Sequence, residues 1–187
     1  PQPILERIKD TNIHSLVLVS TVRQAKKAEI LGASAVIAVG QEGGGHIGKD
    51  DLGTIVLIPR IVESVSIPVI ASGGIGDGRG FLAALALGAD GIEMGTRFIA
   101  TKECVDAVQT YKQALVEGSE MDTVVIKRTF GTPGRVIKSD YTMKILESEQ
   151  LGATYEDLKE RISGKANLAY IYGGDEANGF AWAGQVM

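Results

Sequence analysis

The chain is poor in several residue types, and each scarcity narrows what the protein can be. It contains one cysteine, Cys104, which excludes a disulfide framework and a cysteine-based metal site and favours a reducing compartment. No apolar run approaches the roughly 18 residues of a membrane span. The start, PQPILERIKD, has neither the charged region and apolar core of a signal peptide nor an initiator Met. We therefore expect a cytoplasmic protein, and a chain processed or cut from something longer.

Positive charge is also limited, because the net charge is -4 and no basic stripe is visible. This balance argues against nucleic acid or a membrane surface as a partner. Proline is low at 5 residues while glycine is high at 24, a combination that indicates turns instead of disorder. With 187 residues, 44% of them hydrophobic, the chain is long enough for one domain or for a domain with an appendage.

The first half alternates short apolar strands with helices. The sequence predicts strands at 14–21, 34–40, 67–74 and 90–96, and helices at 3–10, 22–33, 54–65 and 78–89, the third broken at Pro59. The strands are apolar nearly throughout, which is typical of parallel strands covered on both faces. LGASAVIAVG and LGADGIEMG repeat a helix end, a Gly-Ala turn and a strand, with Gly32 suited to a left-handed turn. An α/β fold follows.

The pattern changes from about Glu103. A polar helix is expected at 103–117, a short turn-rich stretch at 123–137, and a second helix in TYEDLKERISG, with a Thr before it and a Gly after it. No βα repeat is visible here. The sequence therefore predicts two domains, the βα units in 1–102 and a mostly helical appended domain in 103–187.

Two predicted strands end in loops that suit an anion, ASGGIGDG and EMGTRF. Small residues let backbone N–H groups point outward, and the start of the next helix adds positive potential. In a (β/α) barrel, phosphate commonly lies between the loops after the last two strands. The residues expected to form such a cradle are Ser72, Gly73, Gly74, Gly95 and Thr96. The alternative is that these glycines only make tight turns.

The stretch GQEGGGHIG, residues 40–48, follows the second predicted strand and so lies on the same rim. Three consecutive glycines leave the main chain open to close approach. We expect a flat ring to lie against this backbone with His46 facing it. A lone histidine more often makes a structural hydrogen bond, but the flanking glycines favour a functional role here. His14 precedes a strand and is expected to be structural.

GQEGGGHIG, IPVIASGGIGDGRGFLAALALGADGIEMGTRFIATKE and GDEANGFAWAGQ together resemble the nitronate monooxygenases, also called 2-nitropropane dioxygenases. Flavin-dependent enoyl-ACP reductases share these motifs. The resemblance implies a (β/α)8 TIM barrel that binds FMN, with an appended domain. It also implies that Gly44 and Gly45 approach the flavin, that His46 is catalytic and that Gln185 lies near the flavin. The ribityl phosphate would be held, mostly through backbone groups, by Gly73, Gly74, Glu93, Met94, Gly95 and Thr96.

The chain also departs from the family. The family begins with a strand carrying an APM-like segment and has a later strand that supplies an Asn, and neither is present. A complete barrel of this kind takes about 250 residues. We therefore expect only its C-terminal half, four parallel βα units, with the appended domain. Some relatives also have a polar residue where this chain has Val39.

The resemblance implies an oxidoreductase that uses FMN and dioxygen to convert alkyl nitronates to a carbonyl compound and nitrite, with His46 as base. One alternative is an NADH-dependent enoyl-ACP reductase acting on an enoyl thioester. Another is a flavin-binding fragment without turnover, which pairs with a missing N-terminal half or with a copy of itself.

A fourth interpretation is a nucleotide-binding barrel similar to inosine-monophosphate dehydrogenase, which shares the glycine loops. That family uses a loop cysteine as nucleophile, and Cys104 follows the last phosphate loop, which is the wrong place. We expect Cys104 to be buried and inert. Trp182 and Tyr170 are expected to be packing residues.

Overall fold

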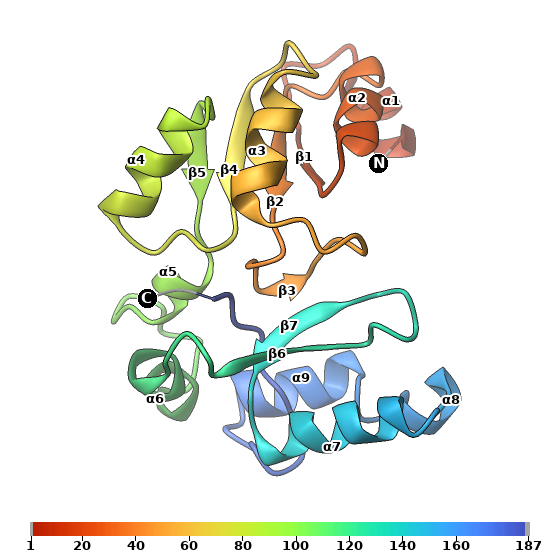
Figure 1. Cartoon of the computed structure of the whole chain (residues 1–187), viewed down its shortest axis with the longest axis vertical. Helices are drawn as coiled ribbons and strands as arrows, with labels where there is room; N and C mark the ends of the chain where they lie inside the picture. Colours follow the sequence, from red (N-terminus) through yellow and green to blue (C-terminus); the bar gives the residue numbers. More distant parts are fainter. Residues whose placement is uncertain (1, 186–187) are drawn as a thin grey trace. The chain divides into compact units, whose positions relative to one another are not determined.

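The computed structural model describes residues 2–185, which divide into two compact units. Unit 1 runs up to Glu42 and resumes over Asp50–Met94, and unit 2 takes Gly43–Lys49 and the residues from Gly95 onward (Figure 1). Each unit is described by itself. The predicted domain boundary after residue 102 stays a prediction.

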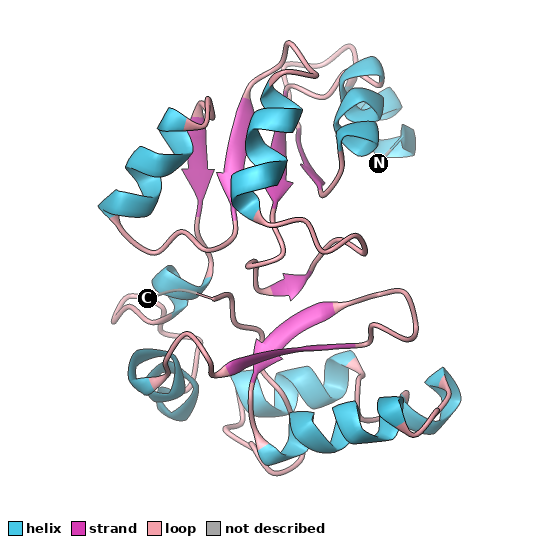
Figure 2. Cartoon of the chain, in the orientation of Figure 1, coloured by secondary structure: helices cyan, strands magenta, loops and turns pink. Residues whose placement is uncertain are grey.

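Unit 1 is an α/β layer built on a parallel sheet. Its strands are β1 (Leu16–Val19), β2 (Ala35–Val39), β4 (Val69–Ser72) and β5 (Gly91–Glu93), in the spatial order β1-β2-β4-β5. All the neighbouring pairs are parallel. The helices are α1 (Gln2–Ile8), α2 (Val22–Ile30), α3 (Thr54–Val62) and α4 (Gly78–Ala86) (Figure 2). The predicted parallel α/β arrangement is therefore confirmed.

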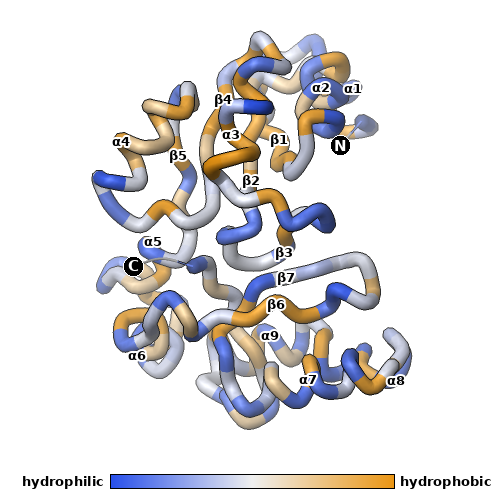
Figure 3. The backbone as a smooth tube through the Cα atoms, in the orientation of Figure 1, coloured by the Kyte–Doolittle hydropathy of each residue, from blue (hydrophilic) through white to orange (hydrophobic). Residues whose placement is uncertain are grey.

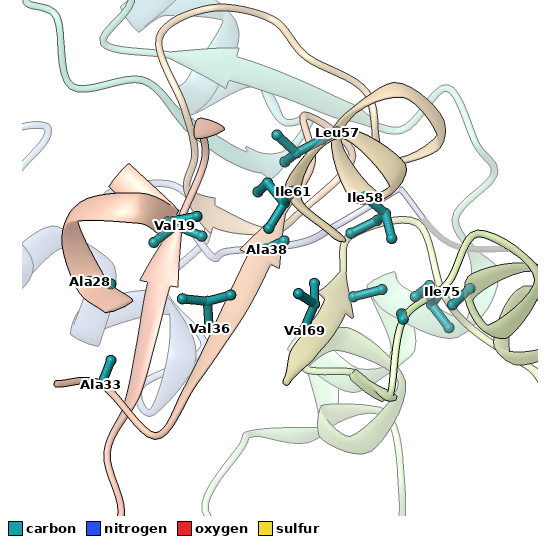
Figure 4. Close-up of a cluster of buried hydrophobic side chains, with 14 residues drawn as sticks. Val19, Ala28, Ala33, Val36, Ala38, Leu57, Ile58, Ile61, Val69 and Ile75 are labelled. Carbon is teal, nitrogen blue, oxygen red and sulfur yellow. The ribbon is translucent and has the colours of Figure 1, made fainter. Parts of the chain in front are cut away.

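The core of unit 1 lies between α3 and the strands. Leu57, Ile58 and Ile61 of α3 face Val36 and Val69 of the sheet, all almost fully buried (Figure 4). Hydrophobic residues continue along β2 and α3 (Figure 3). Strands this apolar need cover, and α3 provides it on one face.

Pro59 lies inside α3, so the predicted break at this residue was wrong. A proline in a helix removes one backbone donor and crowds the carbonyl four residues earlier. Here that carbonyl belongs to Ile55 in the first turn, and the buried side chains of Leu57, Ile58 and Ile61 hold the helix in place. Tertiary packing outweighs the local cost.

The repeated Leu-Gly-Ala segments make the same helix end. Gly32 and Gly88 have φ of 85° and 92°, and in each case the following alanine donates its N–H to the carbonyl five residues back, at 3.0 Å. The predicted left-handed turn at Gly32 is confirmed. A third copy, at Gly152, has φ of 87° and the same 3.0 Å hydrogen bond from Ala153.

Unit 2 combines helices with a small antiparallel sheet. Its strands are β3 (Gly45–His46), β6 (Thr123–Ile126) and β7 (Gly134–Ile137), in the order β3-β7-β6. Its helices are α5 (Thr96–Ile99), α6 (Gln109–Glu117), α7 (Asp140–Gln150), α8 (Tyr155–Leu158) and α9 (Gly164–Ile171). The sheet corrects the picture of 123–137 as merely turn-rich, because this stretch is a β-hairpin.

Two predicted helix boundaries were also wrong. The helix expected from Glu103 begins only at Gln109, since turns fill the residues before it. The helix in TYEDLKERISG ends at Leu158, and Gly164 opens α9 instead of closing the earlier helix, because Ser163 caps α9 by accepting from the Ala166 N–H.

The last described residues run beside β7. Ile137 donates its N–H to the Ala181 carbonyl at 2.9 Å, and Val136 forms an isolated antiparallel bridge with Trp182. The buried Asn167 amide of α9 donates to the Phe180 carbonyl at 2.9 Å. The GDEANGFAWAGQ motif is thus fixed within unit 2. Across residues 2–185, no helix has the length and apolar character needed to cross a membrane.

Candidate functional site

The loop after β4 in unit 1 has unusual backbone geometry. Gly73 and Gly74 have φ of 99° and 73°, a region that side chains rarely tolerate. Within residues 2–185, neither of their amide groups donates a hydrogen bond, while the Gly73 carbonyl accepts from Thr54 Oγ1 at 2.9 Å. The loop therefore presents two consecutive N–H groups that an anion could accept.

Ser72 and Glu93 meet at the carboxyl ends of their neighbouring strands. The Ser72 hydroxyl donates to the Glu93 carboxylate, and Ser72 is buried. Since the hydroxyl hydrogen is already used, Ser72 has no O–H left for a phosphate. Any anion held here would have to rely on backbone groups, and the Glu93 carboxylate would repel it.

The start of α4 is already satisfied from within the chain. The Asp77 carboxylate accepts from the backbone N–H groups of Arg79 at 2.9 Å and Gly80 at 3.3 Å, and it pairs with the Arg79 guanidinium. Hydrogen bonds from Arg79 and Gly80 lower the pKa of Asp77 to about 2. The sequence predicted that the N-terminus of this helix would help to bind an anion, but Asp77 already accepts from two of its N–H groups. The N–H groups of Gly73 and Gly74 remain available as donors.

Glu42, inside the glycine-rich stretch, has a structural partner. Its carboxylate accepts from the Thr54 backbone N–H at 2.9 Å and caps the start of α3, where Gly53 offers no side chain. A Cβ at Gly40 would lie 2.5 Å from the Thr54 backbone nitrogen and would also clash with Thr54 Oγ1, so only glycine fits there. Part of the glycine content therefore serves packing within unit 1.

Gly44 and Gly45 belong to unit 2, where the chain's own C-terminal segment approaches them. A Cβ at Gly44 would lie 2.6 Å from the Gly184 nitrogen and 2.8 Å from the Ala183 carbonyl carbon. Gly45 has φ of 76° and faces the Trp182 indole. The close approach accounts for glycine at position 44 and the positive φ accounts for it at position 45, while contact with a flavin stays a prediction.

His46 lies in a cluster with Lys127 and Trp182, all in unit 2. Lys127 Nζ is 3.0 Å from His46 Nε2, and it lies 5.0 Å from the centroid of the Trp182 ring. The His46 and Trp182 rings have centroids 5.1 Å apart at 46°. His46 itself is exposed, whereas only 6% of Lys127 is exposed.

Electrostatics favour a neutral imidazole at this position. Partial burial, and then the positive charge of Lys127, lower the pKa of His46 below its usual 6.5. Burial also lowers the pKa of Lys127, while the Glu149 carboxylate counteracts that effect. At neutral pH, His46 is therefore an uncharged ring with one N–H and one lone pair.

Sequence reasoning missed Lys127. It lies just after a strand of a hairpin that the sequence did not reveal, 81 residues from His46. A lysine in KRTFGTPG carries no sign of burial or of positive φ, although the structure gives it φ of 64°. Only an expectation of the β6–β7 hairpin would have placed it beside β3.

The remaining predicted residues of unit 2 are linked to the C-terminal segment. The Gly184 N–H donates to Thr96 Oγ1 at 2.9 Å. Gln185, the residue that follows Gly184, is partly buried. The helix after Gly95, α5, has only four residues. The Thr96 hydroxyl oxygen therefore accepts a hydrogen bond from the backbone of the AGQ segment.

The predicted site residues fall in both units. Ser72, Gly73, Gly74, Glu93 and Met94 are in unit 1, and Gly44, Gly45, His46, Gly95, Thr96 and Gln185 are in unit 2. The structure brings residues together within each set, and their assignment to one site stays a prediction. In the part of the chain that the structure describes, no group of His, Cys, Asp and Glu residues could hold a metal ion.

Comparison with known proteins supports the resemblance. The nitronate monooxygenase family model matches residues 1–187. A probable nitronate monooxygenase of Staphylococcus aureus is 36% identical over 98% of the chain, and one of Staphylococcus saprophyticus is 38% identical over the same share. In each case the chain spans 54% of the relative's length.

Solved structures agree. FabK from Thermotoga maritima superimposes with a TM-score of 0.92 at 38% identity, covering 99% of this chain and 58% of its own. Nitroalkane oxidase from Streptomyces ansochromogenes gives a TM-score of 0.79 at 30% identity, covering 98% of this chain and 55% of its own. The chain therefore spans little more than half of the proteins it matches.

Proposed function

Since the chain belongs to the nitronate monooxygenase family, we propose that it carries part of an FMN-dependent oxidoreductase that converts alkyl nitronates, with dioxygen, to a carbonyl compound and nitrite. The observation that supports this most directly is the position of His46, which is exposed at the end of the glycine-rich stretch with Nε2 3.0 Å from Lys127 Nζ, and whose pKa is lowered by burial and by the Lys127 charge. A neutral ring can take a proton, which suits a base near neutral pH.

The residues present fit FMN at its phosphate end. Gly73 and Gly74 offer open N–H groups, and the positive φ of both would strain any other residue. We propose that this loop holds the ribityl phosphate through backbone donors and that Glu93, Met94, Gly95 and Thr96 contribute backbone groups, since the Glu93 carboxylate itself would repel an anion. Ser72 fixes Glu93 instead of binding the phosphate by its hydroxyl. When bound, FMN supplies the electron chemistry.

We propose that Gly44, Gly45 and Gln185 lie near the flavin ring and that His46 faces the substrate. With a neutral nitroalkane, His46 takes the proton from the carbon next to the nitro group. With a nitronate, that proton is already absent, and His46 only orients the anion. His46 is therefore needed as a base with the nitroalkane and only as an orienting group with the nitronate.

The test is His46→Ala in the full chain, with His14→Gln as the matched control because His14 is the other histidine. Flavin binding is followed by visible absorption, and nitrite production is measured with nitronate and with nitroalkane. We expect FMN to bind His46→Ala while nitroalkane turnover falls at least about 100-fold. Full turnover in this variant would refute the role of His46.

A second candidate is NADH-dependent reduction of an enoyl thioester, because the same motifs occur in flavin-dependent enoyl-ACP reductases. The N–H of the exposed His46 ring is a donor that suits a thioester carbonyl. Assays with nitronate and with crotonyl thioester on the same preparation distinguish the two candidates.

The size of the chain supports a final set of proposals. The four parallel strands of unit 1 and the match to about half of each relative suggest the C-terminal half of a (β/α)8 barrel in residues 1–102, with an appended domain in 103–187. Activity would then require a missing N-terminal half or a second copy of the chain. A chain that binds FMN without turnover is the outcome expected if that half is absent, and the turnover of His46→Ala is then compared with that of the unsubstituted chain after the N-terminal half has been supplied.

A further inference from the structure

Lys127 is held in a fixed position by contacts of its backbone. It follows β6 with φ of 64°, a conformation that non-glycine residues seldom adopt. Its N–H donates to Glu149 Oε1 of α7 at 2.6 Å, and Thr129 Oγ1 donates to Glu149 Oε2 at 3.2 Å. Lys127 and Glu149 are both buried. A strained residue whose backbone is fixed by a buried carboxylate is often found at a functional site.

The Lys127 side chain is directed at the imidazole of His46. Nζ lies 3.0 Å from His46 Nε2 and 5.0 Å from the centroid of the Trp182 ring. Trp182 is itself confined, because a Cβ on Gly134 would lie 2.7 Å from its ring. The aromatic face and the Glu149 carboxylate both favour a charged ammonium in this otherwise buried place.

The chemistry of the pair fixes the tautomer. A lysine ammonium has donors and no acceptor, so a hydrogen bond to Nε2 requires the lone pair of that nitrogen. The ring proton must then be on Nδ1. We propose that Lys127 is a positioning residue that donates to Nε2 of His46 and thereby fixes both the orientation of the ring and its Nδ1–H tautomer.

The surrounding charges are consistent with this arrangement. Glu149 on α7 is the acidic group that acts on Lys127. Arg135 on β7 pairs across from Gly45 and donates to Thr123 Oγ1 at 3.0 Å, and Lys49 follows β3 beside Gly131. The positive charge that acts on His46 is that of Lys127, and it opposes a second proton on the ring.

The consequence for catalysis, which depends on the proposed function, concerns Nε2. Its lone pair can accept a substrate proton only after Lys127 withdraws its N–H. A nitronate makes no such demand. Loss of the ammonium should therefore alter nitroalkane turnover more than nitronate turnover, and Nδ1–H remains the donor that a substrate oxygen can meet.

The test is nitrogen-15 NMR of the imidazole rings in the full chain, without flavin. The chain has two histidines, so His14→Gln assigns the His46 signals. We expect unsubstituted His46 to show the Nδ1–H tautomer and a pKa below 6.5. Lys127→Met should raise that pKa and populate the Nε2–H tautomer, while Lys127→Arg, which keeps a cationic donor, should restore both towards the original values.

A dominant Nε2–H tautomer in the unsubstituted chain would overturn the proposal, and so would a Lys127→Met variant whose His46 tautomer and pKa are unchanged. If Lys127→Met fails to fold, the His46 tautomer and pKa measured in the unsubstituted chain and in Lys127→Arg still test the proposal. The NMR readout needs neither FMN nor substrate. A failure of the proposed function would therefore leave the tautomer result intact, and an unexpected tautomer would leave the proposed function to its own test.

Discussion

Gly44 illustrates how a single residue can be constrained by the chain's own backbone. The neighbouring atoms are the Gly184 nitrogen and the Ala183 carbonyl carbon, which belong to the main chain and not to movable side chains. No rotamer change can relieve a clash with them. The position therefore tolerates no Cβ without displacement of the C-terminal segment from its place beside β3.

We predict that Gly44→Ala lowers the free energy of unfolding by about 1–3 kcal/mol, the usual cost of overpacking. Gly78→Ala is the control, since a Cβ at this first position of α4 meets no atom within 4 Å. It should be neutral or slightly stabilising, by up to about 1 kcal/mol. Urea unfolding of both variants measures the difference. Equal stability of the two variants would contradict the close approach at Gly44.

At this scale the sequence predicted part of the candidate site. The glycine run marked His46, because histidine next to glycine stands out. It could not reveal Lys127, whose importance comes from burial and a left-handed backbone. It also could not show that Glu42 caps α3, since the capped N–H of Thr54 is 12 residues away. The N-cap residue itself is Gly53, which has no side chain that would indicate a cap.

The three Leu-Gly-Ala helix ends offer a test at the level of the element. Gly32 has φ of 85° with no atom within 4 Å of an added Cβ, while Gly88 has φ of 92° with Val62 Cγ1 at 3.0 Å. Gly32→Ala should therefore cost only the strain of the left-handed conformation, about 1–2 kcal/mol.

Gly88→Ala should cost more, because strain is added to a tight contact. Thermal unfolding of the two variants gives the order. Gly152 also has a positive φ, 87°, and no atom within 4 Å of an added Cβ, so Gly152→Ala should lower the unfolding temperature by about as much as Gly32→Ala. The reverse order of Gly32 and Gly88 would show that Val62 moves aside at no cost.

Elements with a strong pattern were predicted well, and those without one were not. The strands of unit 1 are apolar runs between clear helix ends, so their positions and parallel arrangement could be predicted. The β6–β7 hairpin joins two four-residue strands by a long turn, and β3 has only two residues. Such short strands form because α7 and the C-terminal segment cover them, which no local pattern reveals.

At the scale of the whole molecule, pH should alter stability through His46. Its folded pKa lies below the unfolded value of 6.5, so below that pH the unfolded chain binds more protons than the folded one. Stability should therefore fall as the pH drops from about 6.5 towards the folded pKa. His46→Gln should flatten this part of the curve.

Asp77 contributes in a lower window. Its pKa of about 2 lies below the reference value of 3.8, so its contribution is present above that reference and is lost as the pH falls through about 2. Asp77→Asn removes it. Urea unfolding between pH 7 and pH 2 separates the two windows, and a His46→Gln curve that keeps its slope near pH 6 would contradict the assignment.

Trp182 is the only tryptophan in the chain, and it lies 5.1 Å from the His46 ring and 5.0 Å from Lys127 Nζ. Its emission therefore comes from a single known place in unit 2. Protonation of the imidazole or loss of the ammonium changes the electric field at the indole. The chain thus contains an intrinsic fluorescent reporter for the state of the pair, readable without label, flavin or substrate.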